Sequence, residues 1–111
     1  MNKKVWIVYL DPSKNFESAR KFGDLRPIFS KMHGSAYDHP QRLLAEARES
    51  LKDFTPGDYI LMVGDTSLYV LAAMVAAEMS DYQEVNLLRW NRMNVDYMPL
   101  NVNLNVDTFN K

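Results

Sequence analysis

The polar residues best placed to bind a ligand follow three apolar runs of the chain. Asp11 and Ser13 come after the run 5–10, the run 58–64 leads into the polar segment 65–67, and Arg89 stands near the end of the run 84–90. Open α/β sheets place ligands outside the carboxyl ends of their parallel strands, so these runs, taken as strands, would bring the residues to one rim. The candidate ligand-binding residues are therefore Asp11, Ser13, Gly64, Asp65, Thr66, Ser67 and Arg89.

The segment around Gly64 is open to two interpretations. A glycine at a strand end, followed by hydroxyl residues that open a helix, can hold an anion with free amides and the helix dipole. Asp65, however, places negative charge where a phosphate would bind, and Asp65 or Thr66 acting as an ordinary N-cap explains the same residues without a ligand. Neither a GxGxxG nor a GxxxxGK[ST] motif is present. A nucleotide or phosphate site at this rim is thus the alternative hypothesis.

No other residues form a recognisable catalytic or metal-binding set. Asp11 and Asp65 would have to lie within a few ångströms of each other to act as a carboxylate pair, and their spacing does not fix that distance. His33, Asp38 and His39 have no known metal-ligand spacing. The chain contains no cysteine, which excludes thiolate catalysis. We therefore predict no catalytic residue, no metal and no cofactor, and favour a protein that is not an enzyme.

Length and charge restrict the class of protein further. The 111 residues are enough for one domain, and a formal net charge of -1 argues against a protein built to grip nucleic acid. Trp90 between Arg89 and Arg92 could stack on a base, but the chain lacks the basic patch that such proteins carry. The longest apolar stretch, 68–77, is about half of the ~20 residues that span a bilayer. We expect a cytoplasmic protein without a membrane segment or an export signal.

Apolar periodicity predicts alternating strands and helices. Strands are expected at 5–10, 58–64, 84–90 and 95–106, and helices at 15–22, 38–54 and 67–79, the last of them the most buried helix. Gly23 is expected to stop the first helix, and residues 25–30 are either loop or a short edge strand. This order predicts one α/β domain over residues 1–111. It would be a small three-layer Rossmann-like domain with a mostly parallel central sheet and a C-terminal antiparallel hairpin.

The last strand has the clearest alternation in the chain. Its apolar residues are Leu100, Val102, Leu104 and Val106. Its asparagines are Asn101, Asn103 and Asn105. The pattern predicts one packed and one solvated face, and Pro99 favours an edge position. An edge strand without lysines pairs readily with another chain, so we expect a homo-oligomer. The candidate interface residues are Trp90, Asn101, Asn103 and Asn105.

Two apolar segments and the helix between them carry a resemblance. The segment GDYILMVGD at 57–65, the alanine-rich helix after it and the segment VNLLRWNR at 85–92 resemble small proteins of tailed bacteriophages, marine phages especially, to which no reaction is assigned. The likeness covers roughly residues 57–104, and the first half of the chain only in outline. It implies a shared fold and a phage-encoded protein acting in the host bacterial cytoplasm, and it disfavours a structural role in the virion. No functional residue is carried over from it.

Together, these observations favour a small non-enzymatic interaction module of phage type. Its expected partners are a second copy of the chain and a host or phage protein. The alternative is a nucleotide- or phosphate-binding domain that uses the carboxyl rim of the parallel strands.

Overall fold

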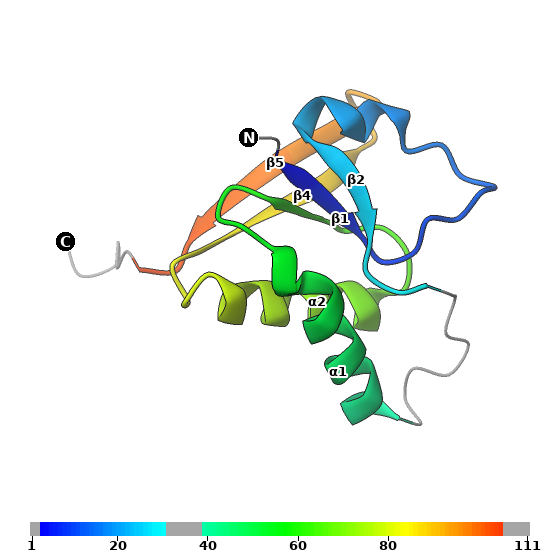
Figure 1. The fold of residues 1–111 in the computed structure, drawn as a ribbon. Helices are drawn as coiled ribbons and strands as arrows, with labels where there is room; N and C mark the ends of the chain where they lie inside the picture. The colour runs from blue at the N-terminus through cyan, green and yellow to red at the C-terminus, as the bar shows by residue number, and fades with distance from the viewer. Residues whose placement is uncertain (1–2, 31–38, 106–111) are drawn as a thin grey trace.

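Five strands form one sheet in the computed structural model, which describes residues 3–30 and 39–105 (Figure 1). The strands are β1 (Lys4–Ile7), β2 (Asp24–Pro27), β3 (Tyr59–Leu61), β4 (Glu84–Asn91) and β5 (Asp96–Asn103). The α-helices are α1 (Pro40–Ser50) and α2 (Thr66–Met79), and the 3₁₀ helices are η1 (Glu17–Phe22) and η2 (Leu51–Asp53). Every predicted strand and helix is present, with most strands shorter than expected. The segment 25–30 contributes residues 25–27 to β2.

The sheet has the strand order β2-β1-β3-β4-β5. Strands β1 to β4 are parallel, and β5 returns antiparallel to β4. The sequence predicts this for β1, β3, β4 and the hairpin, and leaves the place of β2 open. The chain leaves β1 toward β2 and then passes back over β1 to reach β3. Because such crossovers are right-handed, the first connection lies on one face of the sheet and the later two on the other. Figure 1 shows this arrangement, with α1 and α2 below the sheet and η1 above it.

The two faces of the sheet are covered unequally. One core cluster joins the sheet to α1, η2 and α2 and includes Trp6, Leu51 and Ala72. The opposite cluster joins the sheet to residues in and before η1 and includes Ile7, Phe16 and Leu88. That second covering element is a 3₁₀ helix of 6 residues, so the three-layer Rossmann-like arrangement is not confirmed. The fold is an α/β sheet with full helices on one face.

Gly23 ends η1, as its sequence position predicts. Its φ of 155° carries the chain directly into β2, where the Asp24 N–H donates to the Lys3 carbonyl at 2.9 Å. A Cβ atom on residue 23 would lie 2.4 Å from that carbonyl oxygen. Only glycine allows the two backbones to approach this closely.

Helix α1 starts later and ends earlier than the helix predicted at 38–54. Asp38, the expected N-cap, lies outside the described residues, and the N-cap in the structure is His39, which forms no side-chain capping bond. The predicted apolar stripe is present, because Leu43 and Ala47 are buried and Leu51 continues the stripe into η2. The last predicted turn is therefore a 3₁₀ helix.

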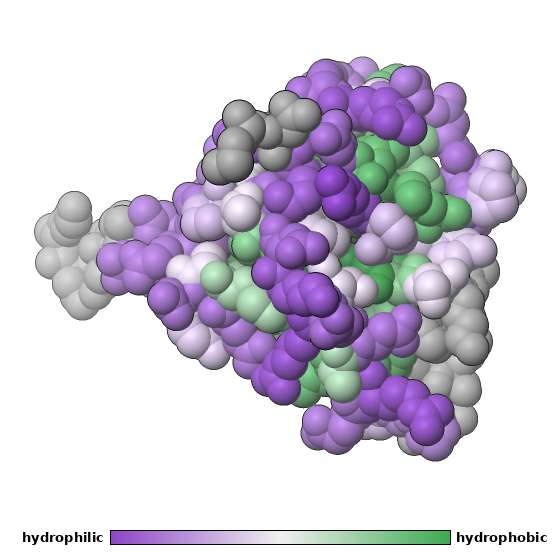
Figure 2. Space-filling view, viewed as in Figure 1, coloured by the Kyte–Doolittle hydropathy of each residue, from purple (hydrophilic) through white to green (hydrophobic). Residues whose placement is uncertain are grey.

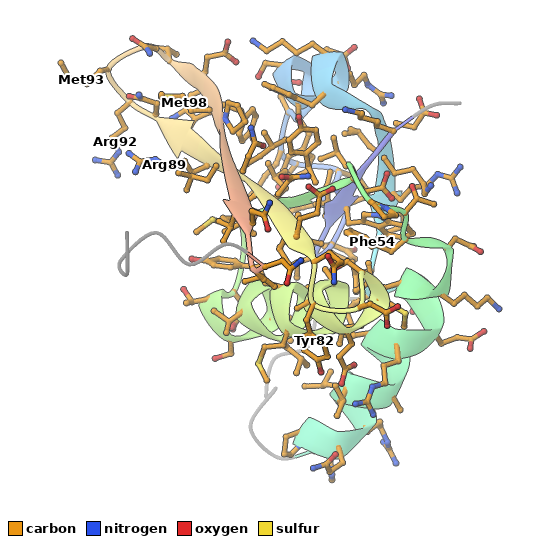
Figure 3. All side chains as sticks on the ribbon, turned by 90° about the vertical axis from the view of Figure 1, so that its left-hand side faces the viewer. Phe54, Tyr82, Arg89, Arg92, Met93 and Met98 are labelled. Carbon is orange, nitrogen blue, oxygen red and sulfur yellow. The ribbon has the colours of Figure 1, made fainter. Side chains whose placement is uncertain are left out.

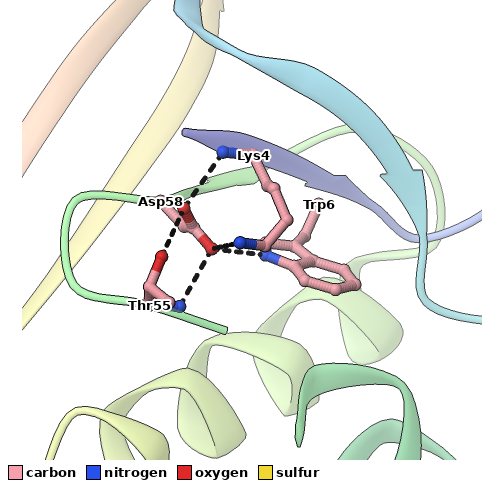
Figure 4. A network of polar contacts seen from close by, with 4 residues as sticks. All are labelled: Lys4, Trp6, Thr55 and Asp58. Carbon is pink, nitrogen blue, oxygen red and sulfur yellow. Dashed lines mark hydrogen bonds and ion pairs between the residues drawn. The ribbon is translucent and has the colours of Figure 1, made fainter. Parts of the chain in front are cut away.

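Asp58 is a fully buried carboxylate at the start of β3 (Figure 4). Its Oδ1 accepts hydrogen bonds from the Lys4 N–H at 3.0 Å and the Thr55 hydroxyl at 3.1 Å. Its Oδ2 accepts from the Trp6 indole N–H at 3.1 Å and the Thr55 N–H at 3.0 Å, and the Lys4 ammonium lies 3.4 Å away. The carboxylate thus fastens the turn before β3 to the first residues of β1. Nothing in the sequence distinguished Asp58 from an ordinary strand-start residue.

The pKa of Asp58 results from opposed effects. Burial raises it, because a charge is poorly solvated in the protein interior. The hydrogen bonds from Thr55, Trp6 and Lys4 favour the charged form, and together they hold the pKa below its ordinary value of 3.8. The carboxylate is therefore ionised at neutral pH.

We predict that Asp58→Asn lowers the free energy of unfolding by about 3 kcal/mol or more, because removing one partner of a buried charged network leaves the others unpaired. Chemical denaturation followed by tryptophan emission measures this, since Trp6 is 3% exposed when folded. The control is Asp53→Asn, the same change at an exposed neighbour. It should leave the unfolding midpoint unchanged, and an equal loss in the two variants would contradict a special role for Asp58.

We also predict that Asp58 makes the protein acid-labile. Its folded pKa lies below the unfolded value, so the stability it contributes is complete above about pH 4 and is lost as the pH falls through the folded pKa. As the pH is lowered from 7 to 2, the melting temperature should therefore fall more steeply in the wild type than in Asp58→Asn. Hydrogen bonds from Ser13, Arg48 and Lys21 lower the pKa of other carboxylates in both proteins. Those carboxylates are Asp11, Glu78 and Asp96. Parallel curves would overturn the prediction.

Candidate functional site

Strand β5 exposes apolar side chains that the sequence predicted to be packed. Leu100, Val102 and Leu104 are 42%, 40% and 47% exposed. They lie on the side of the sheet that carries the helices, because Val102 pairs with Val85 and Leu100 with Leu87. The predicted packed face is therefore wrong for these three residues, and Val106 lies outside the described residues. The physical reason is that α2 packs on β3 and β4, one strand short of β5.

The outer side of α2 is also uncovered. Val70 and Met74 are 48% and 60% exposed, so the expectation that this is the most buried helix is wrong for its outer face. Buried residues lie only on the opposite side of the helix, where Leu68, Ala72, Val75 and Ala76 face the core. An apolar sequence on all sides predicted burial, but no helix or strand within residues 3–30 and 39–105 covers the outer side of α2.

These two exposed sets border one groove, which we call the α2–β5 groove. It encloses about 350 Å³. Its lining is apolar and comprises Met62, Tyr69, Val70, Ala73, Met74, Ala77, Val85, Leu87, Val102 and Leu104. In contrast, the side of the molecule drawn in Figure 2 is mostly hydrophilic, with apolar side chains reaching the surface in separate areas. Contiguous exposed apolar surface of this kind is a feature of many protein interaction sites and ligand grooves.

The asparagines of β5 are exposed, as predicted, and β5 is an edge strand of the sheet. The Asn105 amide donates to Gln83 Oε1 at 3.1 Å, and the Asn105 N–H donates to Asn103 Oδ1 at 2.9 Å. Asn101 is paired with Asn86 of β4. Strand β5 itself contains no lysine, and the Lys21 ammonium of η1 pairs with Asp96 at the first residue of the strand.

The predicted rim residues form separate local turns. Asp11 Oδ1 accepts from the Ser13 N–H at 2.9 Å and from the Ser13 hydroxyl at 2.7 Å, and these hydrogen bonds lower the pKa of Asp11. A hollow of about 240 Å³ beside Asp11 is lined by residues 10–12, 14–17, 20 and 25. None of the residues 64–67 lines it.

The segment after β3 caps α2. Asp65 is the N-cap, and its Oδ1 accepts from the Ser67 N–H at 2.8 Å. The Tyr69 hydroxyl donates to Thr66 Oγ1 at 3.4 Å. Gly64 has a φ of 103°, which turns the chain from β3 into the helix. The capping interpretation of Asp65 is therefore confirmed, and its carboxylate lies at the amides that an anion would use.

Arg89 and Trp90 lie in the β4–β5 hairpin. Trp90 is 41% exposed and contacts the Tyr97 ring edge-on, with centroids 5.0 Å apart. Figure 3 shows Arg89 at the same end of the hairpin as Arg92, Met93 and Met98. Because β4 extends to Asn91, Arg89 lies inside the strand, two residues before its carboxyl end.

No group of three or more metal-ligating side chains occurs within residues 3–30 and 39–105. His33 and Asp38 lie outside these residues. In the same part of the chain, neither helix has the length and apolar character needed to cross a membrane.

Sequence reasoning missed the apolar residues that complete this surface. Val70 and Met74 were counted as core, because an apolar helix gives no sign of which side lacks a neighbour. A further exposed apolar residue, Met93, stands in the hairpin turn outside the groove and is 90% exposed. That position in a polar turn is the one signal that could have marked it from the sequence.

A family model described as Phage Pam3 gp32-like protein matches residues 3–104. The chain belongs to this phage family. The match confirms the resemblance seen in residues 57–104 and extends it over the first half of the chain. Neither the curated proteins nor the solved structures contain a match. The family description names no activity, so the function has to be argued from the surface of the molecule.

Proposed function

We propose that this phage-family protein is a non-enzymatic interaction module that self-associates through β5. The observation that carries the proposal is that β5 has an open backbone edge and that half-exposed apolar side chains lie along it and directly after it, at Leu100, Val102 and Leu104. Exposed edge strands pair with other chains unless charge, proline or a covering element prevents it. Burying apolar surface adds a favourable contribution of about 25 cal/mol per Å².

The surroundings of β5 support the same function. The α2–β5 groove continues the apolar surface from the strand to Val70 and Met74 on the helix. A host or phage protein in the bacterial cytoplasm is the second partner that we propose, since the groove offers apolar area beyond the strand itself.

An anion-binding rim is the second candidate function. The observation that favours it is the topology, because the chain leaves β1 and β3 in opposite directions along the sheet, and ligands of open α/β sheets bind at such switch points. The carboxylates of Asp11 and Asp65 stand against it, because each lies at one of the two turns and would repel a phosphate.

We predict that light scattering at micromolar concentration gives twice the 12.9 kDa mass of the chain. Leu100→Lys should weaken the association at least about tenfold, because an unpaired charge in the interface costs more than 1.4 kcal/mol. The residue is 42% exposed, so its replacement should leave the fold intact.

The matched control is Met93→Lys, the same cation on an exposed apolar residue of the hairpin turn. It should keep the mass of the wild type. A monomeric wild type, or equal loss of association in the two variants, would overturn self-association through β5.

For the rim, we predict that inorganic phosphate and ATP leave the melting temperature of the protein unchanged. A ligand that binds the folded state must raise its stability, and the Asp65 carboxylate already occupies the helix terminus. The comparison variant is Asp65→Asn, which keeps a capping side chain and removes the charge. Stabilisation of the wild type by several degrees would favour the second candidate function instead.

A further inference from the structure

The hydrogen-bond pattern of the hairpin determines which backbone groups of β5 point away from the sheet. Leu104 N–H donates to the Gln83 carbonyl at 2.8 Å, so residue 104 faces β4. The Leu88 carbonyl accepts from the Met62 N–H, so the backbone of Leu88 faces β3 and not β5. Pro99, which lies opposite Leu88 in the ladder, therefore forms no hydrogen bond with β4. Residues alternate along an antiparallel strand. The outward-facing residues are therefore Tyr97, Pro99, Asn101 and Asn103.

Only two of these positions keep an N–H group free along the described edge. The Tyr97 N–H donates to Asp96 Oδ1 at 2.8 Å, and Pro99 has no N–H. Beyond the strand, the Asn105 N–H is held by Asn103 Oδ1. The open part of the edge thus consists of Asn101 and Asn103, each with a donor and an acceptor, between two blocked positions.

This short window is complementary to itself. When a second copy lies antiparallel along β5 with Asn101 opposite its Asn103, the two pairs exchange four N–H···O bonds and use every free donor. A register with Asn101 opposite Asn101 would set the Asn103 carbonyl against the ring of Pro99, which has no hydrogen to donate. The first register is therefore favoured.

The apolar side chains fit the same register. Val102 then lies on the twofold axis, opposite Val102 of the second copy, and Leu100 lies opposite Leu104. These three half-exposed apolar side chains, two in β5 and Leu104 directly after it, all lie on one face. On the other face, each Asn101 meets Asn103, so polar residues meet polar ones.

We propose that two copies of the chain join β5 to β5 with Val102 on the twofold axis, forming one continuous ten-stranded sheet. This inference rests on the proposed self-association and specifies its partner and register. The occupant of the β5 edge is thus a second copy of this chain, chosen because its donors, acceptors and apolar side chains match those of the edge in reversed order.

The test uses Val102→Cys in the full chain, which has no cysteine of its own. Residues 102 form a non-hydrogen-bonded antiparallel pair in the proposed dimer, and the close side chains of such pairs suit a disulfide. Mild oxidation should convert most of the protein to a covalent dimer that reducing agent separates. The double variant Leu100→Cys with Leu104→Cys should also cross-link, since each cysteine faces the other one across the axis.

Asn101→Cys is the matched control, one residue away on the opposite face. It should remain uncross-linked in the proposed register and would cross-link in the alternative one. A wild type that has the mass of a dimer, with no cross-link through residue 102 and none in the double variant, overturns this register and leaves the proposed function standing. A monomeric wild type overturns both.

Discussion

The carboxylate of Asp58 fixes the position of the two central strands. It is fully buried and accepts hydrogen bonds from the backbone of β1, from the Trp6 indole and from the turn before β3. The neighbouring residue Tyr59 pairs with Val5, so these bonds lie at the start of the β1–β3 ladder. An ionised carboxylate in the interior is tolerated only when both of its oxygens accept hydrogen bonds. Here the donors belong to β1 and to the turn that precedes β3. One side chain thus joins the start of β1 to the turn before β3 and gives the buried Trp6 indole its hydrogen-bond partner.

The handedness of the crossovers explains why one corner of the sheet stays open. The connections after β2 and β3 place both α-helices on one face, and the single connection between β1 and β2 places η1 on the other. The chain then ends its sheet with a hairpin and supplies no further helix among the described residues. Helix α2 reaches β4 but leaves β5 beside it uncovered. The α2–β5 groove, with its apolar lining, is therefore a result of topology.

The carboxyl rim of the parallel strands and the outer edge of β5 differ in which polar groups lack a hydrogen-bond partner. At the rim, Asp11 and Asp65 are bonded within their own turns, and the helix terminus has its cap. At the edge, backbone groups of Asn101 and Asn103 face outward beside half-exposed apolar side chains. The proposed association through β5 would use these backbone groups and this apolar surface, whereas the polar groups of the rim already have partners.

The sequence by itself predicted the order of the main strands and helices, a mostly parallel sheet, the final hairpin and the Gly23 stop, and it limited the cap of α2 to Asp65 or Thr66. These features follow from local patterns, because periodicity, glycine conformation and capping act over a few residues. The tertiary structure alone decided that Asp58 is a buried acceptor and that Leu100, Val102, Val70 and Met74 reach the surface. An apolar residue has the same pattern whether or not a neighbour covers it, and only the packing of distant elements, set here by crossover handedness, supplies or withholds that neighbour.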